Sequence, residues 1–343
     1  MAYHSSSVVA TVLVFLIFSL SGCKKSKTKT TAAPPPPASL DLIKGAKSFA
    51  DFTVLEKEVQ LSSGKDHFIS LITDFDIDQQ GNIIICDGWQ SKTVFIADTT
   101  GKFLSDLGGQ GHGPGEYQTP LSVAINREGE IFLNDYMGRK VLVYTSNYNY
   151  KSMMFPDRTE YFIHINKNDE IFLYDGMLQP SFIRSKKPNI FPTIHKFSST
   201  GKHMISFALI PEEISDLNFS AGYNGMVIDT SGFIYEINPL FYRIRKYDSE
   251  GKLIKEFSEG KIIYEESEGR RSPVLMQGPL VLDKGIVFIQ YDNQLDFYDT
   301  DGNLLVKSIP FEKDVLGCHG NSIYVKLEDY PEANPKIGRY TLR

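Results

Sequence analysis

Two ionisable side chains in apolar strand segments are the first candidates for chemistry. Asp76 and His164 each precede a turn-forming Asp or Asn by two residues, a position where other copies of the same pattern carry Ala124, Val227 and Val281. A carboxylate and an imidazole can exchange protons with a substrate or bind a metal ion. Buried polar groups are also commonly satisfied by backbone groups or water, and that structural role is the favoured interpretation of both residues.

Motifs that would identify a metal site or a nucleophile are absent from the sequence. Asp74, Asp76 and Asp78 alternate along a strand, and they lack the Gly and the distal Glu of an EF-hand calcium loop. The seven His and three Cys form neither an HExxH nor a CxxC spacing, and there is no GxSxG nucleophile elbow. We therefore predict no catalytic residue, no metal and no cofactor.

Aromatic and arginine side chains in predicted loops form the second group of candidates. These residue types dominate binding hot spots. We predict that a ligand or partner contacts Trp89, His112, Tyr136, Arg139, Phe182, Arg184 and Tyr242. Trp89, the only Trp in the chain, has an equally weighted alternative, which is to cover the core at the end of a strand.

A Gly-rich loop at 108–119 contains His112 and precedes an apolar strand. Such loops can hold phosphate when their backbone N–H groups point at the ligand. This loop lacks a GK[ST] ending and leads into a strand rather than a helix. Tight packing between neighbouring structural units is therefore the favoured explanation of its glycines.

The elements that would position these residues recur along the chain. An apolar run ends in Asp or Asn, a Gly follows two or three residues later in most copies, and a second apolar run begins. Copies occupy 75–87, 123–135, 163–175, 227–238 and 280–290, with a degenerate copy at 315–326. Asp and Asn bond to the backbone of tight turns, and Gly adopts the positive φ that such turns need. Each copy therefore predicts an antiparallel hairpin.

A third and a fourth strand follow most of these hairpins. The turn between them contains Gly101, Gly201, Gly251 and Gly302, which gives a period near 50 residues. Four short strands per period are typical of propeller blades. The last copy supplies only three strands, and 52–61 is a strand without a hairpin partner. We predict an all-β, six-bladed β-propeller with four-stranded antiparallel blades, whose ring closes when this N-terminal strand completes the last blade.

This architecture places the two groups of candidates in different regions. The innermost strands of a propeller line a central channel, so Asp76 and His164 are predicted to face that channel. The loops between second and third strands, and between successive blades, gather on one face, which we call the loop-rich face. The aromatic and arginine candidates are predicted to lie there, where loops on a rigid scaffold usually carry function.

One unit of the repeat, 107–150, has a more specific pattern. Its Gly-rich loop is followed by Glu116 and Tyr117, Pro120, an apolar strand, Gly129, a strand ending in Asp, and a basic residue before the next strand. This pattern resembles an NHL repeat, and the GxGPGEY form is similar to that of six-bladed propeller lipoproteins of Gram-negative bacterial envelopes. The resemblance implies a six-bladed propeller with a binding or scaffolding role more often than a catalytic one.

The N-terminal segment is typical of an export signal. Residues 8–20 are apolar, and this run is short for a membrane span but fits the core of a signal peptide. It ends in LSGC, which resembles the lipobox of bacterial lipoproteins, where the cysteine, here Cys23, is lipidated. An ordinary secretory signal is the alternative. We predict a lipoprotein signal peptide at 1–22, a lipidated, flexible Lys/Pro-rich tether at 23–47 and the propeller at 48–343.

The net charge and the cysteine content bear on the class of binding partner and on the cellular compartment. The formal net charge of −6 gives no indication of nucleic-acid binding. Cys86 and Cys318 are expected to be buried free thiols, with a disulfide between them as the alternative. We predict a monomer, anchored to a membrane through the lipid on Cys23, at the periplasmic side or the outer-membrane surface of a bacterial cell envelope.

Two classes of function are compatible with the sequence. The first hypothesis is an envelope lipoprotein that acts as a non-catalytic binding or scaffold module, whose loop-rich face binds an unidentified envelope protein, peptide or glycan. The second is a propeller hydrolase or lyase, similar to lactonases, with a site in the central channel. Such an enzyme needs converging metal ligands, for which the sequence offers only Asp76, His164 and His319.

Overall fold

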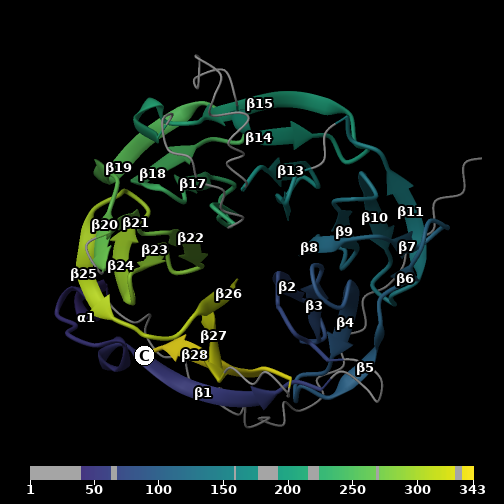
Figure 1. Cartoon of the computed structure of the whole chain (residues 1–343), viewed down its shortest axis with the longest axis horizontal. Coiled ribbons are helices and arrows are strands. Elements are labelled where there is room, and N and C mark those ends of the chain that lie inside the picture. The colour runs from purple at the N-terminus through teal and green to yellow at the C-terminus, as the bar shows by residue number, and fades with distance from the viewer. Residues whose placement is uncertain are drawn as a thin grey trace, which may run out of the picture. The chain divides into compact units, whose positions relative to one another are not determined.

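The computed structural model is a six-bladed β-propeller, as the sequence predicts (Figure 1). Six four-stranded antiparallel sheets surround a common centre. The structure describes residues 40–62, 68–157, 160–176, 192–214, 224–267, 270–328 and 334–343. Within these ranges, none of the helices is both long and apolar enough to cross a membrane.

The first three blades follow one another along the chain. Blade 1 consists of β2 (Asp74–Ile77), β3 (Ile83–Asp87), β4 (Thr93–Ala97) and β5 (Phe103–Asp106). Blade 2 consists of β8 (Pro120–Ile125), β9 (Ile131–Asp135), β10 (Lys140–Tyr144) and β11 (Tyr150–Met154). Blade 3 consists of β12 (Phe162–Ile165), β13 (Ile171–Tyr174), β14 (Pro192–Phe197) and β15 (His203–Leu209).

Blades 4 and 5 repeat the same strand order. Blade 4 consists of β16 (Met226–Ile228), β17 (Ile234–Asn238), β18 (Phe241–Tyr247) and β19 (Leu253–Lys261). Blade 5 consists of β22 (Met276–Leu282), β23 (Ile286–Tyr291), β24 (Gln294–Asp299) and β25 (Leu304–Pro310). Two short pairs lie outside the blades, namely β6 (Gly109–Gln110) with β7 (Glu116–Tyr117), and β20 (Tyr264–Ser267) with β21 (Arg270–Pro273).

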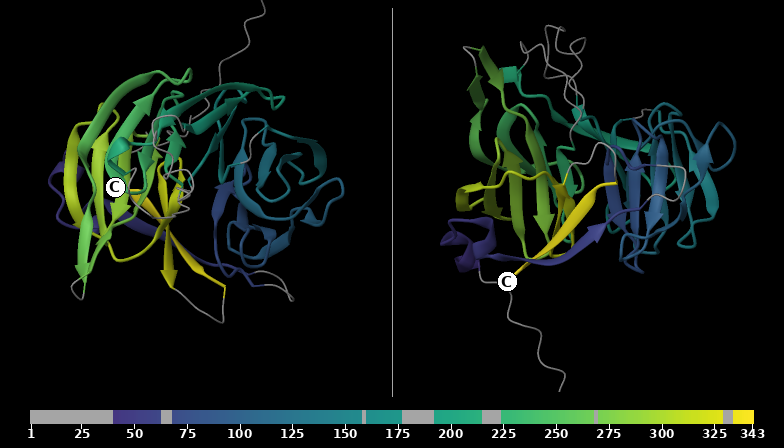
Figure 2. Two further views of the ribbon diagram at one scale, coloured as in Figure 1. Left: turned by 45° about the horizontal axis from the view of Figure 1, so that its top comes forward. Right: turned by 60° about the horizontal axis from the view of Figure 1, so that its bottom comes forward.

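Blade 6 is assembled from strands of both chain ends. It consists of β26 (Val315–His319), β27 (Ser322–Glu328), β28 (Lys336–Leu342) and, outermost, β1 (Thr53–Gln60). β1 is antiparallel to β28, with a register that runs from Thr53 opposite Leu342 to Gln60 opposite Lys336. In Figures 1 and 2 the purple β1 lies beside the yellow C-terminal strand.

The propeller unit begins earlier in the chain than predicted. Residues up to 47 were expected to form a flexible tether, but α1 (Leu40–Lys44) packs the fully buried side chain of Ile43 into the hydrophobic core of blades 5 and 6. The helix can dock because Leu40 and Ile43, three residues apart, lie on one face and both pack against this core. The other helical segments of the described residues, η1 (Phe49–Asp51) and η3 (Glu212–Ile214), are single short turns.

In blades 1 to 4 the hairpin between the first two strands is stabilised by an Asp or Asn side chain. In blade 1 the Asp78 carboxylate accepts hydrogen bonds from the backbone N–H groups of Gln80 at 2.9 Å and Asn82 at 2.8 Å. In blade 3 the turn lacks Gly, and Asp169 adopts the positive φ instead, at 58°. Asp tolerates this conformation better than most residues, so the departure in sequence preserves the turn.

Packing between neighbouring blades buries the core and explains part of the Gly-rich loop. One cluster joins blades 1 and 2 through Ile84, Val94, Val123 and Leu133, all nearly inaccessible to solvent. A Cβ atom on Gly108 would lie 2.4 Å from the Tyr144 hydroxyl of blade 2, which leaves no room for a side chain. The interpretation of this loop as a packing junction therefore agrees with the structure.

The two cysteines of the propeller are free thiols, the favoured expectation. Cys86 on β3 is fully buried in the core between blades 1 and 2, whereas Cys318 on β26 is only partly buried. Burial raises the pKa of both thiols well above the ordinary value, since a thiolate would lose its hydration. Neither residue therefore has the low thiol pKa of a reactive cysteine.

Candidate functional site

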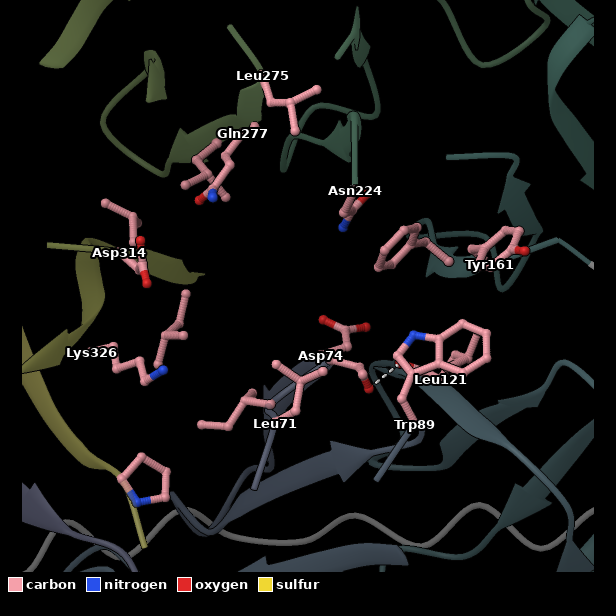
Figure 3. Close-up of a pocket in the computed structure, with 18 of the residues that line it drawn as sticks. Leu71, Asp74, Trp89, Leu121, Tyr161, Asn224, Leu275, Gln277, Asp314 and Lys326 are labelled. Carbon is pink, nitrogen blue, oxygen red and sulfur yellow. Dashed lines mark hydrogen bonds between the residues drawn. The ribbon is translucent and has the colours of Figure 1, made fainter. Parts of the chain in front are cut away.

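The candidate site is a cavity of about 710 Å³ at the centre of the ring (Figure 3). It lies where the inner strands begin, and every blade contributes to its wall. One lining residue from the start of each inner strand, in blade order, is Asp74, Leu121, Phe162, Asn224, Gln277 and Val315. Because β-strand ends of a closed propeller are held by their neighbours, this wall is preorganised rather than formed by loops alone.

An aromatic cluster forms one side of the cavity entrance. Trp89 follows β3 and is 43% exposed, and its ring centroid lies 6.2 Å from that of Tyr161 and 6.3 Å from that of Tyr136. Tyr136 and Tyr161 stack at 4.5 Å, and the Tyr161 hydroxyl donates to the Tyr136 hydroxyl at 3.1 Å. The structure thus brings two predicted residues together, and it adds Tyr161, which the sequence analysis missed.

Asp74 supplies a carboxylate to the cavity wall, next to Trp89 in Figure 3. Its Oδ2 accepts hydrogen bonds from the Ser122 hydroxyl and from the Val123 N–H at 3.1 Å. Burial, together with the charge of Asp76, outweighs these bonds and raises the pKa of Asp74 to about 7. The sequence analysis considered Asp74 only as one of three alternating Asp residues and did not assign it to a site.

Polar side chains on other blades face the same cavity. Asn224 and Gln277 point into it from blades 4 and 5, and Asp314 and Lys326 lie across the cavity from Trp89 in Figure 3. These residues were also missed by the sequence analysis. A shared signal exists, since Asp74, Asn224 and Asp314 each lie at or just before the first residue of an inner strand.

His164, one of the two predicted channel residues, is held neutral by its surroundings. Its Nε2 lies 3.1 Å from the Asn224 amide oxygen. Burial lowers the pKa of His164 to about 4, because the charged imidazolium would lose its hydration. A neutral imidazole that is hydrogen-bonded to an amide can position a polar group of the cavity wall, since Asn224 lines the cavity.

Asp76, the other predicted channel residue, is paired with a histidine from blade 6. Its Oδ2 accepts the backbone N–H of Ile125 at 2.9 Å, and its Oδ1 lies 3.6 Å from Nδ1 of His319. The neighbouring Asp76 carboxylate raises the pKa of His319 above its ordinary value. The backbone contact fits the structural role that the sequence favoured, and the contact with His319 joins blades 1 and 6.

The remaining predicted residues that the structure describes do not line the cavity. His112 and Arg139 are exposed, and Nδ1 of His112 lies 3.3 Å from the Gln118 side-chain nitrogen. Phe182 and Arg184 lie outside the described residues. Tyr242 is a correction, because it is fully buried and its hydroxyl bonds to the Asp296 carboxylate. It is the second residue of β18, so it packs into the blade instead of lying in a loop.

The described ranges do not contain a cluster of side chains suited to bind a metal ion. No group of three or more His, Cys, Asp or Glu side chains there is arranged to hold a metal ion. Asp76 and His319 form a carboxylate–imidazole pair, with Oδ1 and Nδ1 3.6 Å apart. A carboxylate and a histidine alone do not make up the three or four ligands of a typical protein metal site.

Comparison with protein families agrees with the architecture. A family model described as a 6-bladed beta-propeller, DUF5128, matches residues 46–214, slightly less than half of the chain. Comparison with the curated proteins finds no match. The family description fits the ring, and it states no ligand, partner or reaction.

Solved structures share the fold at low sequence identity. A member of the DUF4221 family from Bacteroides vulgatus is 10% identical, with a TM-score of 0.60 over 85% of this chain and 98% of that chain. A protein from Bacteroides fragilis, described as a candidate exported protein, is 13% identical, with a TM-score of 0.57 over 85% and 95%. A catalytically inactive virginiamycin B lyase from Staphylococcus aureus with quinupristin is 13% identical, with a TM-score of 0.54 over 82% and 83%. At these identities the similarity concerns the fold alone.

Proposed function

We propose that this protein is a lipid-anchored lipoprotein of the bacterial cell envelope that binds a small ligand or a partner segment on its loop-rich face, without catalysis. The observation that carries the proposal is the central cavity, with its partly exposed Trp89 and its polar side chains from several blades. A cavity of about 710 Å³ is within the size range of small-molecule sites.

The proposed localisation is based on the N-terminal sequence. The apolar run at 8–20 ends in LSGC, with Cys23 as the lipidated residue, and a Lys/Pro-rich segment follows. An NHL-type propeller on a tether would present its loop-rich face to other envelope components.

Trp89 gives a direct test of ligand binding. It is the only Trp of the chain, so intrinsic Trp fluorescence reports on this cavity alone. The full chain in a non-ionic detergent is titrated with defined envelope peptides and glycan oligomers. We expect a saturable change in Trp89 emission for one class, and recovery of the ligand chemically unchanged. Conversion of the ligand to a product would instead support the hydrolase or lyase hypothesis.

A matched pair of variants locates the binding event. Leu71→Arg places a long side chain at the cavity entrance, where Leu71 is 42% exposed, so the fold should accept it. Leu104→Arg makes the same change on β5, at a residue that is 47% exposed and does not line the cavity. The first variant should weaken ligand binding at least about tenfold and the second should leave it unchanged. Equal binding by both variants would contradict the proposed site.

Membrane attachment is tested separately in cells. Cys23→Ala removes the acceptor of the lipid, so the propeller should move from the membrane fraction to the soluble fraction. Persistence of the variant in the membrane fraction would contradict lipid anchoring at this residue and would leave the cavity proposal intact.

A further inference from the structure

The charge distribution of the cavity is uneven, and its aromatic side is acidic. Asp74 lies beside Trp89, and Asp76 follows two residues later on the same strand. Within the described residues, no Lys, Arg or His side chain lies within ion-pair distance of Asp74. Lys326, the basic residue of the lining, is on the opposite wall in Figure 3.

The Asp74 carboxylate has room for another hydrogen bond. Its Oδ2 accepts from Ser122 and Val123, and its Oδ1 accepts from the backbone N–H of Phe75 at 2.9 Å. An ionised carboxylate offers about four acceptor positions, and three are used here. In Figure 3 the carboxylate points toward the centre of the cavity, so a ligand group can reach the remaining position.

The ionised form of Asp74 also lacks a compensating charge. The pKa of Asp74 is raised to about 7 because burial and the neighbouring Asp76 both disfavour ionisation. A cation bound at this side of the cavity would offset both effects by its attraction to the ionised carboxylate. Trp89 adds a second attraction, since the face of an indole ring binds cations through its quadrupole.

We propose that the cavity binds an organic cation, with its ammonium group at the Asp74 carboxylate and over the neighbouring Trp89 ring, and its apolar body against Leu121 and Phe162. This inference rests on the proposed binding function and names the chemical class of its ligand. An apolar body is required because Leu71, Leu121, Phe162, Leu275, Leu280 and Leu316 line the same cavity.

Paired probes of equal shape test the charge requirement. The full chain in a non-ionic detergent at pH 8 is titrated with choline and with its uncharged isostere 3,3-dimethylbutan-1-ol, and in parallel with hexylamine and hexan-1-ol. Binding is measured by Trp89 fluorescence and by calorimetry. We expect each cation to bind at least about tenfold more tightly than its neutral counterpart, which is the effect of one partly desolvated ionic contact.

Two acidic residues of the loop-rich face provide a matched comparison. Asp74→Asn removes the charge with little change in shape and should abolish the preference for cations, while hexan-1-ol binding stays the same. Asp292→Asn makes the same change in the β23–β24 turn, outside the cavity lining, and should keep the preference. Asn suits that position, because Asp292 has a positive φ of 42°.

The outcomes separate this inference from the proposed function. If neutral probes bind as tightly as cations, or if Asp74→Asn keeps the preference, the cavity binds ligands but the organic-cation assignment is wrong. If neither these probes nor the envelope peptides and glycans bind, the proposed function itself fails. Should Asp74→Asn not fold, Trp89→Leu, measured by calorimetry, must lower the affinity for choline more than that for the neutral isostere, and equal losses would overturn the inference.

Discussion

The two faces of the propeller differ in how similar the residues of successive blades are. On the face opposite the cavity, the hairpins of blades 1 to 4 repeat one contact, in which Asp78, Asn126, Asn166 and Asp229 accept the backbone N–H four residues later at 2.8–3.1 Å. At the cavity end of the same inner strands, the blades instead present chemically different residues, among them Asp74, Phe162 and Asn224. The repeated face builds the ring, and the varied face carries the chemistry that could distinguish one ligand from another.

The largest expected effect is a loss of stability on the repeated face, when Gly101 in the β4–β5 turn is replaced. This residue has a φ of +86°, and a Cβ atom would lie 2.4 Å from the backbone oxygen of Gln60 on β1. Gly101→Ala should lower the free energy of unfolding by about 3 kcal/mol or more, because the junction of blades 1 and 6 must shift.

Gly285→Ala is the matched control for that change. Gly285 has a similar φ of +76°, but its Cβ would meet only Thr300, at 3.6 Å. The cost should therefore be about 1 kcal/mol, the backbone term alone. Chemical denaturation compares the two variants, and equal costs would show that close packing at the junction of blades 1 and 6 does not matter.

The next effect concerns acid stability near the cavity. The pKa of His164 is about 4 in the folded protein, below its ordinary value near 6.5, so the unfolded state binds the proton more readily. Stability from the neutral imidazole is present above pH 6.5 and is lost as the pH falls toward 4.

His164→Gln should remove that loss. The variant keeps a polar group near Asn224 and Asp76, the groups that face His164, but it has no proton to take up. Thermal melts between pH 7 and pH 4 should show the wild type losing about 1–3 kcal/mol more than the variant. Parallel pH curves would contradict a buried neutral His164.

A smaller effect distinguishes Tyr242 from the aromatic residues of the cavity. Tyr242→Phe removes the hydroxyl that bonds to Asp296 and lies 2.7 Å from the Tyr298 hydroxyl. Stability should fall by about 1–2 kcal/mol, because Asp296 loses a buried donor. Ligand titrations monitored by Trp89 should be unchanged, and weaker binding in this variant would return Tyr242 to the site.

The smallest predicted effect is a shift in one titration. His319 owes its raised pKa mainly to the neighbouring carboxylate of Asp76. Asp76→Asn should lower the pKa of His319 toward the ordinary value, measured by NMR of its ring protons, with little change in the melting temperature. An unchanged pKa would mean that Asp76 and His319 do not form the contact that joins blades 1 and 6.

Much of the fold could be predicted because its determinants are local. Turn residues such as Asp78 act within four residues of the chain, and their spacing repeats near 50 residues. The site depends instead on which residues of different blades meet across the ring. Tyr161 joins Trp89 from two blades away, and no local pattern marks that contact. Tyr242 was wrongly predicted to lie in a loop, because β18 begins at Phe241, one residue before it.

The pairing of β1 with β28 has a consequence for the order of events during synthesis. The strand that is made first finds its partner only when the last residues of the propeller exist, because Thr53 lies opposite Leu342. Until then the nascent chain is an open row of blades with unpaired edges at both ends, a state prone to misassembly. The ring can therefore close only after the C-terminal strand has been synthesised. A prematurely terminated chain would keep its open strand edges and remain vulnerable to proteolysis.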